Sequence, residues 1–120
     1  MPYNLVMTRQ VRDWLHALRT GDPITRRLVS LAIDQLLDEG PLLGRPLADR
    51  VAGSRLHNLK ELRPGSSGRS EVRILFIFDP VRSAVLLVTG DKSGRSNDWY
   101  REAIPTAEAL YDQYLKEQQR

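Results

Sequence analysis

Apolar residues recur at helical spacing in the first third of the chain. Thr8 can cap a helix whose apolar positions fall at i, i+3, i+4 and i+7. Gly21 ends that segment, and Asp22 followed by proline supplies the start of a second helix, which Gly40 ends. The two predicted apolar stripes are Val11, Trp14, Leu15 and Leu18, then Ile24, Leu28, Leu31, Ala32, Leu36 and Leu37. The pattern predicts a helical hairpin, preceded by a short strand at residues 4–7.

The pattern changes to that of strands in the middle of the chain. Residues 40–54 mix turn residues with isolated apolar ones, which is typical of an irregular connection. Strands are predicted at residues 56–63, 71–79 and 84–90, and the short turns between them favour an antiparallel meander. The second and third strands are apolar on both faces, so we expect helices to cover both sides of the sheet.

The C-terminal segment, residues 97–116, is helical in composition and carries one apolar stripe. Pro105 is expected to kink or split this helix early. The element order predicts an α+β fold, with the N-terminal helical hairpin packed on a small antiparallel sheet and a helix at the C-terminus. The chain has 120 residues, which predicts a single domain over residues 1–120.

Composition excludes several classes of protein. No apolar run approaches the roughly 20 residues of a membrane span, and the N-terminus does not resemble a secretory signal, so we expect a cytoplasmic protein that makes no membrane contact. The absence of cysteine excludes disulfides, thiolate nucleophiles and cysteine-ligated metal sites. His16 and His57 are far apart in the sequence, and neither has the spacing of paired metal ligands. We therefore predict that the protein needs no metal or other cofactor.

Positive charge is concentrated in the middle of the chain. The net charge is +3, and residues 55–101 contain nine Lys and Arg against five Asp and Glu. Such a bias favours polyanionic partners. Scattered surface charge is the alternative interpretation.

Strand direction predicts which cations lie together. Glu61 and Arg63 share one face of their strand, and the following hairpin brings Arg73 near them. Lys92 and Arg95 follow the third strand, whose end lies level with the start of the second. We expect the four cations to ring one concave site, which would suit the phosphates of RNA. The alternative is that the arginines of the first two strands are solvated or pair with Glu61.

Aromatic residues and a histidine lie near the same predicted site. Trp99 and Tyr100 open the last helix, where either ring could stack on an unpaired base or pack in the core. His57 could act as a base or remain a hydrogen-bonded surface residue, and Lys60 precedes Glu61 on the same strand. Pattern and composition alone therefore indicate a small basic α+β domain with a potential nucleic-acid site.

Four segments resemble the RelE/HigB superfamily of toxins, in its phage-derived HigB-like branch. They are "NLKELRP" (58–64), "EVRILFIFDP" (71–80), "VLLVTGDKSGR" (85–95) and "WYREAIPTAEALYD" (99–112). The resemblance extends over nearly the whole chain. It implies a RelE-like fold, an antitoxin encoded beside the toxin, and metal-independent cleavage of messenger RNA on the translating ribosome.

The resemblance also implies site residues. Arg73 matches the arginine of the family's tyrosine-arginine strand motif, although Val72 replaces the tyrosine, and Arg63 matches the arginine of the "ELR" strand. Lys92 lies near the family's second catalytic arginine. The predicted catalytic residues are Glu61, Arg63, Arg73 and Lys92, and the predicted RNA-binding residues are His57, Lys60, Arg95 and Tyr100.

Three positions bear on how far the family's chemistry extends to this chain. Glu61 stands where the RelE type has lysine, so it could act as a base or pair with a nearby arginine. Tyr100 approximates the late aromatic of some members. Ser96 stands where a tryptophan is expected in this branch, and the loss of that ring could weaken helix packing or remove a stacking surface.

The leading interpretation is the toxin of a type II toxin–antitoxin pair that cuts messenger RNA on the ribosome. One alternative is a non-enzymatic toxin of the ParE type, which acts on DNA gyrase. Another is an inactive protein that binds its antitoxin and contacts operator DNA through that complex. Fold alone does not separate these functions.

Overall fold

The computed structural model describes residues 3–95 and 97–119, so Ser96 lies outside the described residues. Five strands form one sheet in the order β1-β5-β4-β3-β2. Their bounds are Asn4–Met7 (β1), Ala48–Arg50 (β2), Lys60–Leu62 (β3), Val72–Phe78 (β4) and Ser83–Asp91 (β5). The predicted antiparallel meander is confirmed in β3, β4 and β5. The sheet as a whole is mixed and not antiparallel throughout, because β1 pairs in parallel with β5.

The helices are α1 (Arg9–Gly21), α2 (Pro23–Glu39) and α3 (Asn97–Gln118), with a short 3₁₀ helix, η1 (Gly40–Leu42), after α2. The predicted caps are confirmed. The Thr8 hydroxyl accepts a hydrogen bond from the Val11 amide at 3.4 Å, and the Asp22 carboxylate accepts one from the Thr25 amide at 3.2 Å. These side chains satisfy amides at the helix starts that lack partners within the helix.

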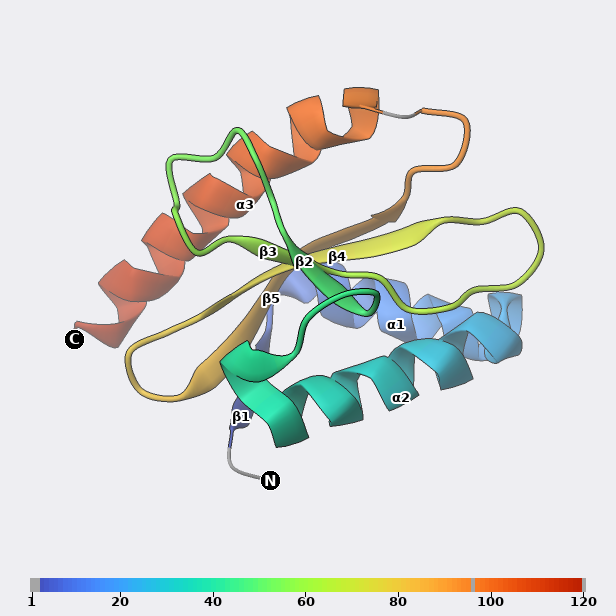
Figure 1. Cartoon of the computed structure of the whole chain (residues 1–120), viewed down its shortest axis with the longest axis horizontal. Helices are drawn as coiled ribbons and strands as arrows, with labels where there is room; N and C mark the ends of the chain where they lie inside the picture. The colour runs from blue at the N-terminus through green and yellow to red at the C-terminus, as the bar shows by residue number, and fades with distance from the viewer. Residues whose placement is uncertain (1–2, 96, 120) are drawn as a thin grey trace.

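Figure 1 shows α3 on one side of the sheet and the pair α1 and α2 on the other. One apolar core joins α1 and α2 to the sheet, and its buried members include Val11, Leu36, Ile74 and Phe76. A second core joins α3 to the opposite face. The predicted α+β class and the two-sided cover are therefore confirmed. None of the described helices is long and apolar enough to cross a membrane.

The predicted buried stripe of α2 is wrong at two positions. Ile24 and Leu31 are 64% and 59% exposed, whereas Thr25 and Val29 are buried. The Thr25 hydroxyl donates to Asp22 and accepts from the Ser67 amide at 2.9 Å, which turns this side of the first helical turn toward the loop before β4. Ile24 consequently faces outward.

Other predicted features also differ from the structure. The segment predicted as an irregular connection, 40–54, contains η1 and the edge strand β2. The strand predicted at 56–63 is shortened to β3, because the chain bends at Leu56 and turns at residues 57–58. Pro105 lies within a continuous α3 and does not split it.

Candidate functional site

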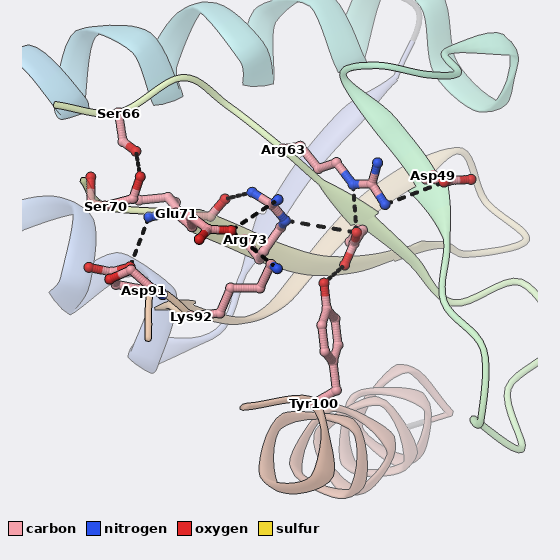
Figure 2. Close-up of polar contacts among 12 residues, drawn as sticks. Asp49, Arg63, Ser66, Ser70, Glu71, Arg73, Asp91, Lys92 and Tyr100 are labelled. Carbon is pink, nitrogen blue, oxygen red and sulfur yellow. Dashed lines mark hydrogen bonds and ion pairs between the residues drawn. The ribbon is translucent and has the colours of Figure 1, made fainter. Parts of the chain in front are cut away.

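Glu61 is the centre of a polar cluster on the face of the sheet that α3 covers, and its neighbours Arg63, Arg73 and Tyr100 are labelled in Figure 2. Only 2% of the residue is exposed. One carboxylate oxygen, Oε1, accepts a hydrogen bond of 2.6 Å from Nε of Arg63, and Oε2 accepts one of 2.6 Å from the Tyr100 hydroxyl. Nε of Arg73 lies 3.9 Å from Oε1. These partners make burial of the carboxylate tolerable, because an unpaired charge at this depth would be strongly destabilising.

The cluster changes the proton affinity of two of its members. Burial, together with the hydrogen bond to Glu61, raises the pKa of Tyr100 to about 12. The hydrogen bond to the same carboxylate raises the pKa of Arg63 above its ordinary value. At neutral pH, Tyr100 is therefore a phenol that donates to Glu61, and Arg63 is a permanent cation.

Arg73 is positioned by β4, two residues before the Leu75 that pairs with Glu61. Its side chain is only 18% exposed. Nη1 donates to the Val72 carbonyl at 2.9 Å, whereas Nε is buried and has no hydrogen-bond partner among the described residues. A buried donor without a partner is costly, so an acceptor brought to this nitrogen would be strongly stabilised.

Lys92 follows the end of β5 and faces the start of β4. Its amide donates to the Glu71 carbonyl at 3.0 Å, and its Nζ lies 3.3 Å from Oε2 of Glu71. The same Oε2 lies 3.9 Å from Nη2 of Arg73, and Nζ of Lys92 lies 5.8 Å from the centroid of the Tyr100 ring. A carboxylate oxygen shared by two cations occupies the kind of position that a phosphate oxygen favours.

Gly90 lets α3 approach the end of β5. A Cβ atom at Gly90 would lie 2.6 Å from Nε1 of Trp99, which is closer than side chains pack. Trp99 is 6% exposed and packs in the core beneath α3, so its role here is that of a core residue. Tyr100, the next residue, points from α3 toward the cluster (Figure 2).

Asp49 belongs to the site, although the sequence did not indicate it. It lies directly opposite Glu61 in the pairing of β2 with β3, and its Oδ2 is 3.3 Å from Nη2 of Arg63. Arg63 therefore separates two carboxylates that would otherwise repel each other. The three residues of β2 are too few to show a strand periodicity, so the pattern offered no signal for Asp49. Glu71 was also missed, although its strand was predicted.

A pocket of about 340 Å³ opens beside the cluster, and Glu61, Arg63 and Tyr100 line it together with Arg50 and Asn97. The four cations predicted to ring one concave site do not do so, because Arg73 and Lys92 are not among the lining residues. They form a second part of the cluster around Glu71. The observed arrangement is a pocket with a cationic edge beside it.

Three predicted RNA-binding residues lie outside the cluster. Nη2 of Arg95 lies 3.0 Å from Glu102 on α3. Lys60 donates to the Pro41 carbonyl at 3.3 Å, in the direction opposite to Glu61, because successive residues of a strand point to opposite faces. His57 lies in an exposed turn before β3. RNA binding by these three residues stays a prediction, and their positions outside the cluster give it no support.

The cluster is balanced in formal charge. The cations are Arg63, Arg73 and Lys92, and the carboxylates are Asp49, Glu61 and Glu71. A phosphate that bound Arg73 and Lys92 would have to displace Glu71, whose side chain is 49% exposed and has room to move into solvent. Within residues 3–95 and 97–119, no group of three His, Cys, Asp or Glu side chains is placed to hold a metal ion.

Comparison with known proteins identifies relatives over most of the chain. The family "Phage derived protein Gp49-like" matches residues 13–112. Two Mycobacterium tuberculosis proteins are similar: "Putative toxin HigB2", 52% identical over 106 residues, and "Putative toxin HigB3", 43% identical over 111 residues. The matched region covers 88% of this chain and 51% of HigB2, so the chain spans about half the length of that relative; for HigB3 the match covers 92% of each chain. No solved structure matches the chain.

Proposed function

The chain belongs to the phage-derived Gp49-like family and is HigB-like, and we propose that it is the toxin of a toxin–antitoxin pair that cleaves messenger RNA on the ribosome. The names of the two relatives support the toxin assignment. The proposal includes a RelE-like arrangement of the fold and an antitoxin encoded beside the toxin, whose complex contacts operator DNA. The place of action is the cytoplasm, where ribosomes translate.

In the proposed reaction, the ribose 2′-hydroxyl attacks the adjacent phosphorus, and the bond from phosphorus to the 5′ oxygen breaks. The products are a cyclic 2′,3′-phosphate and a free 5′-hydroxyl. The proton of the 2′-hydroxyl passes to the Tyr100 oxygen while the Tyr100 proton passes to Glu61, and Lys92 gives a proton to the departing 5′ oxygen. The 2.6 Å hydrogen bond from Tyr100 to Glu61 already provides the second half of this relay.

Arg73 has the role of stabilising the charge that develops on the phosphate. Donors aimed at a developing negative charge and shielded from water make large contributions to such reactions. Nε of Arg73, which has no hydrogen-bond partner among the described residues, is such a donor. Nη2 of the same guanidinium faces the Glu71 oxygen that Lys92 also contacts. RNA binding would replace that carboxylate oxygen by a phosphate oxygen.

The single observation that carries the proposal is the buried Nε of Arg73, which has no hydrogen-bond partner among the described residues and belongs to one of the two cations that share an oxygen of Glu71. A cluster whose only purpose was structural would be expected to satisfy its buried donors. A site that binds an external anion would leave one buried donor free, and the bound anion would then accept its hydrogen bond.

The charge balance of the cluster favours a second candidate function. Three carboxylates already neutralise the three cations, which is the expected state of an ion-pair network that ties the strands together and, through the Tyr100 hydrogen bond to Glu61, fastens α3. In that case the protein would be a non-enzymatic toxin of the ParE type that binds DNA gyrase. The residues of the cluster would then affect stability and not catalysis.

The purified chain can separate the two candidates. In a cell-free translation reaction, the proposed nuclease cuts the messenger only when ribosomes are translating it, and Arg73→Ala abolishes the cuts. Arg101→Ala is the matched control, because Arg101 is an exposed arginine of α3 whose Nη1 lies 3.6 Å from Oδ1 of Asp98, outside the cluster. Inhibition of gyrase supercoiling by the same preparation, with an intact messenger, would establish the second candidate instead.

A further inference from the structure

Among residues 3–95 and 97–119, the sheet ends at β1, and one side of this strand is unpaired. The amides of Asn4 and Thr8 donate to the carbonyls of Arg82 and Leu86 on the β5 side. Because backbone groups alternate in direction along a strand, those of Leu5 and Met7 point away from β5. In the described part of the chain, neither of these outward amides has a hydrogen-bond partner. An edge of this kind can accept a further strand from another polypeptide.

A groove of about 480 Å³ lies beside this edge, between β1, the start of α1 and the C-terminal half of α3. Its apolar lining includes Val6, Met7 and Leu110, and its polar lining includes Arg9 and Arg12. Two strands, β5 and β4, separate β1 from the strand that carries Glu61. The groove is therefore distinct from the candidate catalytic pocket.

The groove has a positive charge that no carboxylate of the described residues pairs with. Arg9 and Arg12 are exposed and lie one turn apart on α1, and neither forms an ion pair with a carboxylate of the described residues. Glu117 is the acidic residue among those that line the groove, and it accepts a hydrogen bond from Gln113 at 3.4 Å. Apolar lining, outward backbone groups and two unpaired arginines together fit an extended segment that carries both apolar and acidic side chains.

A second copy of this chain fits the groove less well. Two copies that joined through β1 about a two-fold axis would bring the same surface of each against the other. Arg9 and Arg12 of one copy would then face the same arginines of its partner, and like charges at a close contact oppose association. The charge of the groove instead selects a partner with acidic residues.

We propose that the free edge of β1 and its groove bind an extended, acidic segment of the antitoxin, which adds a sixth strand to the sheet. This inference rests on the proposed function for the existence of an antitoxin. The segment leaves the Glu61 cluster uncovered, since the groove lies on the far side of β5 and β4. Any inhibition by this segment alone would therefore come from blocking access to the ribosome and not from filling the catalytic pocket.

The test uses the full chain and the purified antitoxin encoded beside it. Arg9→Glu combined with Arg12→Glu should raise the dissociation constant at least about tenfold, because it replaces attraction by repulsion. Arg26→Glu with Arg27→Glu is the matched control, since these arginines are also exposed, on α2, and lie outside the groove. Amide hydrogen exchange provides a second readout, in which the antitoxin should protect the amides of Leu5 and Met7.

Each outcome decides the inference. Weaker binding of the groove variant alone, with protection of both β1 amides, supports it. The inference would be overturned if the complex formed but the groove variant bound as tightly as the wild type and the β1 amides exchanged at their free rate. It would also be overturned if those amides became protected as the concentration of the chain alone was raised, because a second copy of the chain would then occupy the edge. Absence of growth arrest by the wild-type chain would contradict the proposed toxin function but not the binding result, because the two are measured separately.

Discussion

Tyr100 and Glu61, which are 39 positions apart in the sequence, share a hydrogen bond of 2.6 Å between the phenol and the buried carboxylate. This bond connects the first turn of α3 to β3, so it joins the C-terminal helix to the polar cluster. The same carboxylate contacts Arg63 and lies near Arg73. The position of α3 and the charge arrangement of the candidate site therefore depend on one another.

Replacement of Tyr100 by phenylalanine removes the hydrogen bond and retains the ring. We expect a loss of about 1 to 2 kcal/mol in the free energy of unfolding, as for a hydrogen bond to a charged group. Messenger cleavage should fall about a hundredfold if the phenol relays the proton to Glu61. Tyr111→Phe is the matched control, since that hydroxyl has no hydrogen-bond partner in the described residues. Denaturant unfolding and a cleavage assay measure the two effects, and full activity of folded Tyr100→Phe would exclude the relay.

Stability should fall steeply in strong base. Burial, reinforced by carboxylate hydrogen bonds, raises the pKa of Tyr100 and of Tyr114 to about 12 from an ordinary 10.0. Because the folded chain keeps these protons more tightly than the unfolded chain, their stabilising effect is complete below pH 10 and is lost as the pH rises from 10 toward 12. Unfolding free energies across that window should show this loss, and a Tyr100→Phe, Tyr114→Phe variant should show a smaller one. If the phenolate absorbance of the folded protein showed that all of its tyrosines ionise near pH 10, the account would be contradicted.

Glu71→Gln should strengthen anion binding. The substitution removes the carboxylate charge that Arg73 and Lys92 share, so a phosphate no longer competes with it. We expect the dissociation constant of a short single-stranded RNA to fall several-fold at low salt, roughly as for the loss of one competing ion pair. Asp98→Asn is the matched control, because it removes the same charge from the pair with Arg101, which lies outside the cluster. Equal tightening by both variants in a binding titration would mean that only the net charge matters.

Gly90→Ala should destabilise the packing of α3 on the sheet. The added Cβ would lie 2.6 Å from Nε1 of the buried Trp99, which has little room to move. Overpacking of this kind costs about 1 to 3 kcal/mol in the free energy of unfolding. Gly21→Ala is the control, since a Cβ there has nothing within 4 Å. A variant at Gly90 that unfolds at the wild-type denaturant concentration would show that α3 can shift without cost.

Local signals in the sequence explain why much of the fold was predictable. Thr8 and Asp22 mark helix starts because their side chains bond to nearby amides, and both caps are found in the structure. The central strands were predictable because their apolar runs lie between short turns. Arg63 and Arg73 were placed near Glu61 correctly, since strand periodicity and hairpin pairing are enough to bring them together.

Features that depend on distant contacts were not predictable from the pattern. Ile24 and Leu31 have the spacing of a buried stripe, but the bonds of Thr25 to Asp22 and Ser67 set the rotation of α2. The strand β2 exists because it pairs with β3, and its three residues carry no period of their own. Parallel pairing of β1 with β5 joins segments almost 80 residues apart, which no local signal reports.

The most direct measurement of the central claim is a map of new 5′ ends in cellular messenger RNA after induction of the chain without its antitoxin. We predict cuts within translated frames, and we predict that folded Arg73→Ala, which still binds the antitoxin, produces none, whereas Arg101→Ala cuts as the wild type does. Loss of the Arg73 guanidinium should reduce cleavage by about a hundredfold or more, as for removal of a donor to a developing negative charge. Growth arrest without new 5′ ends, or the same cuts in folded Arg73→Ala, would contradict the account.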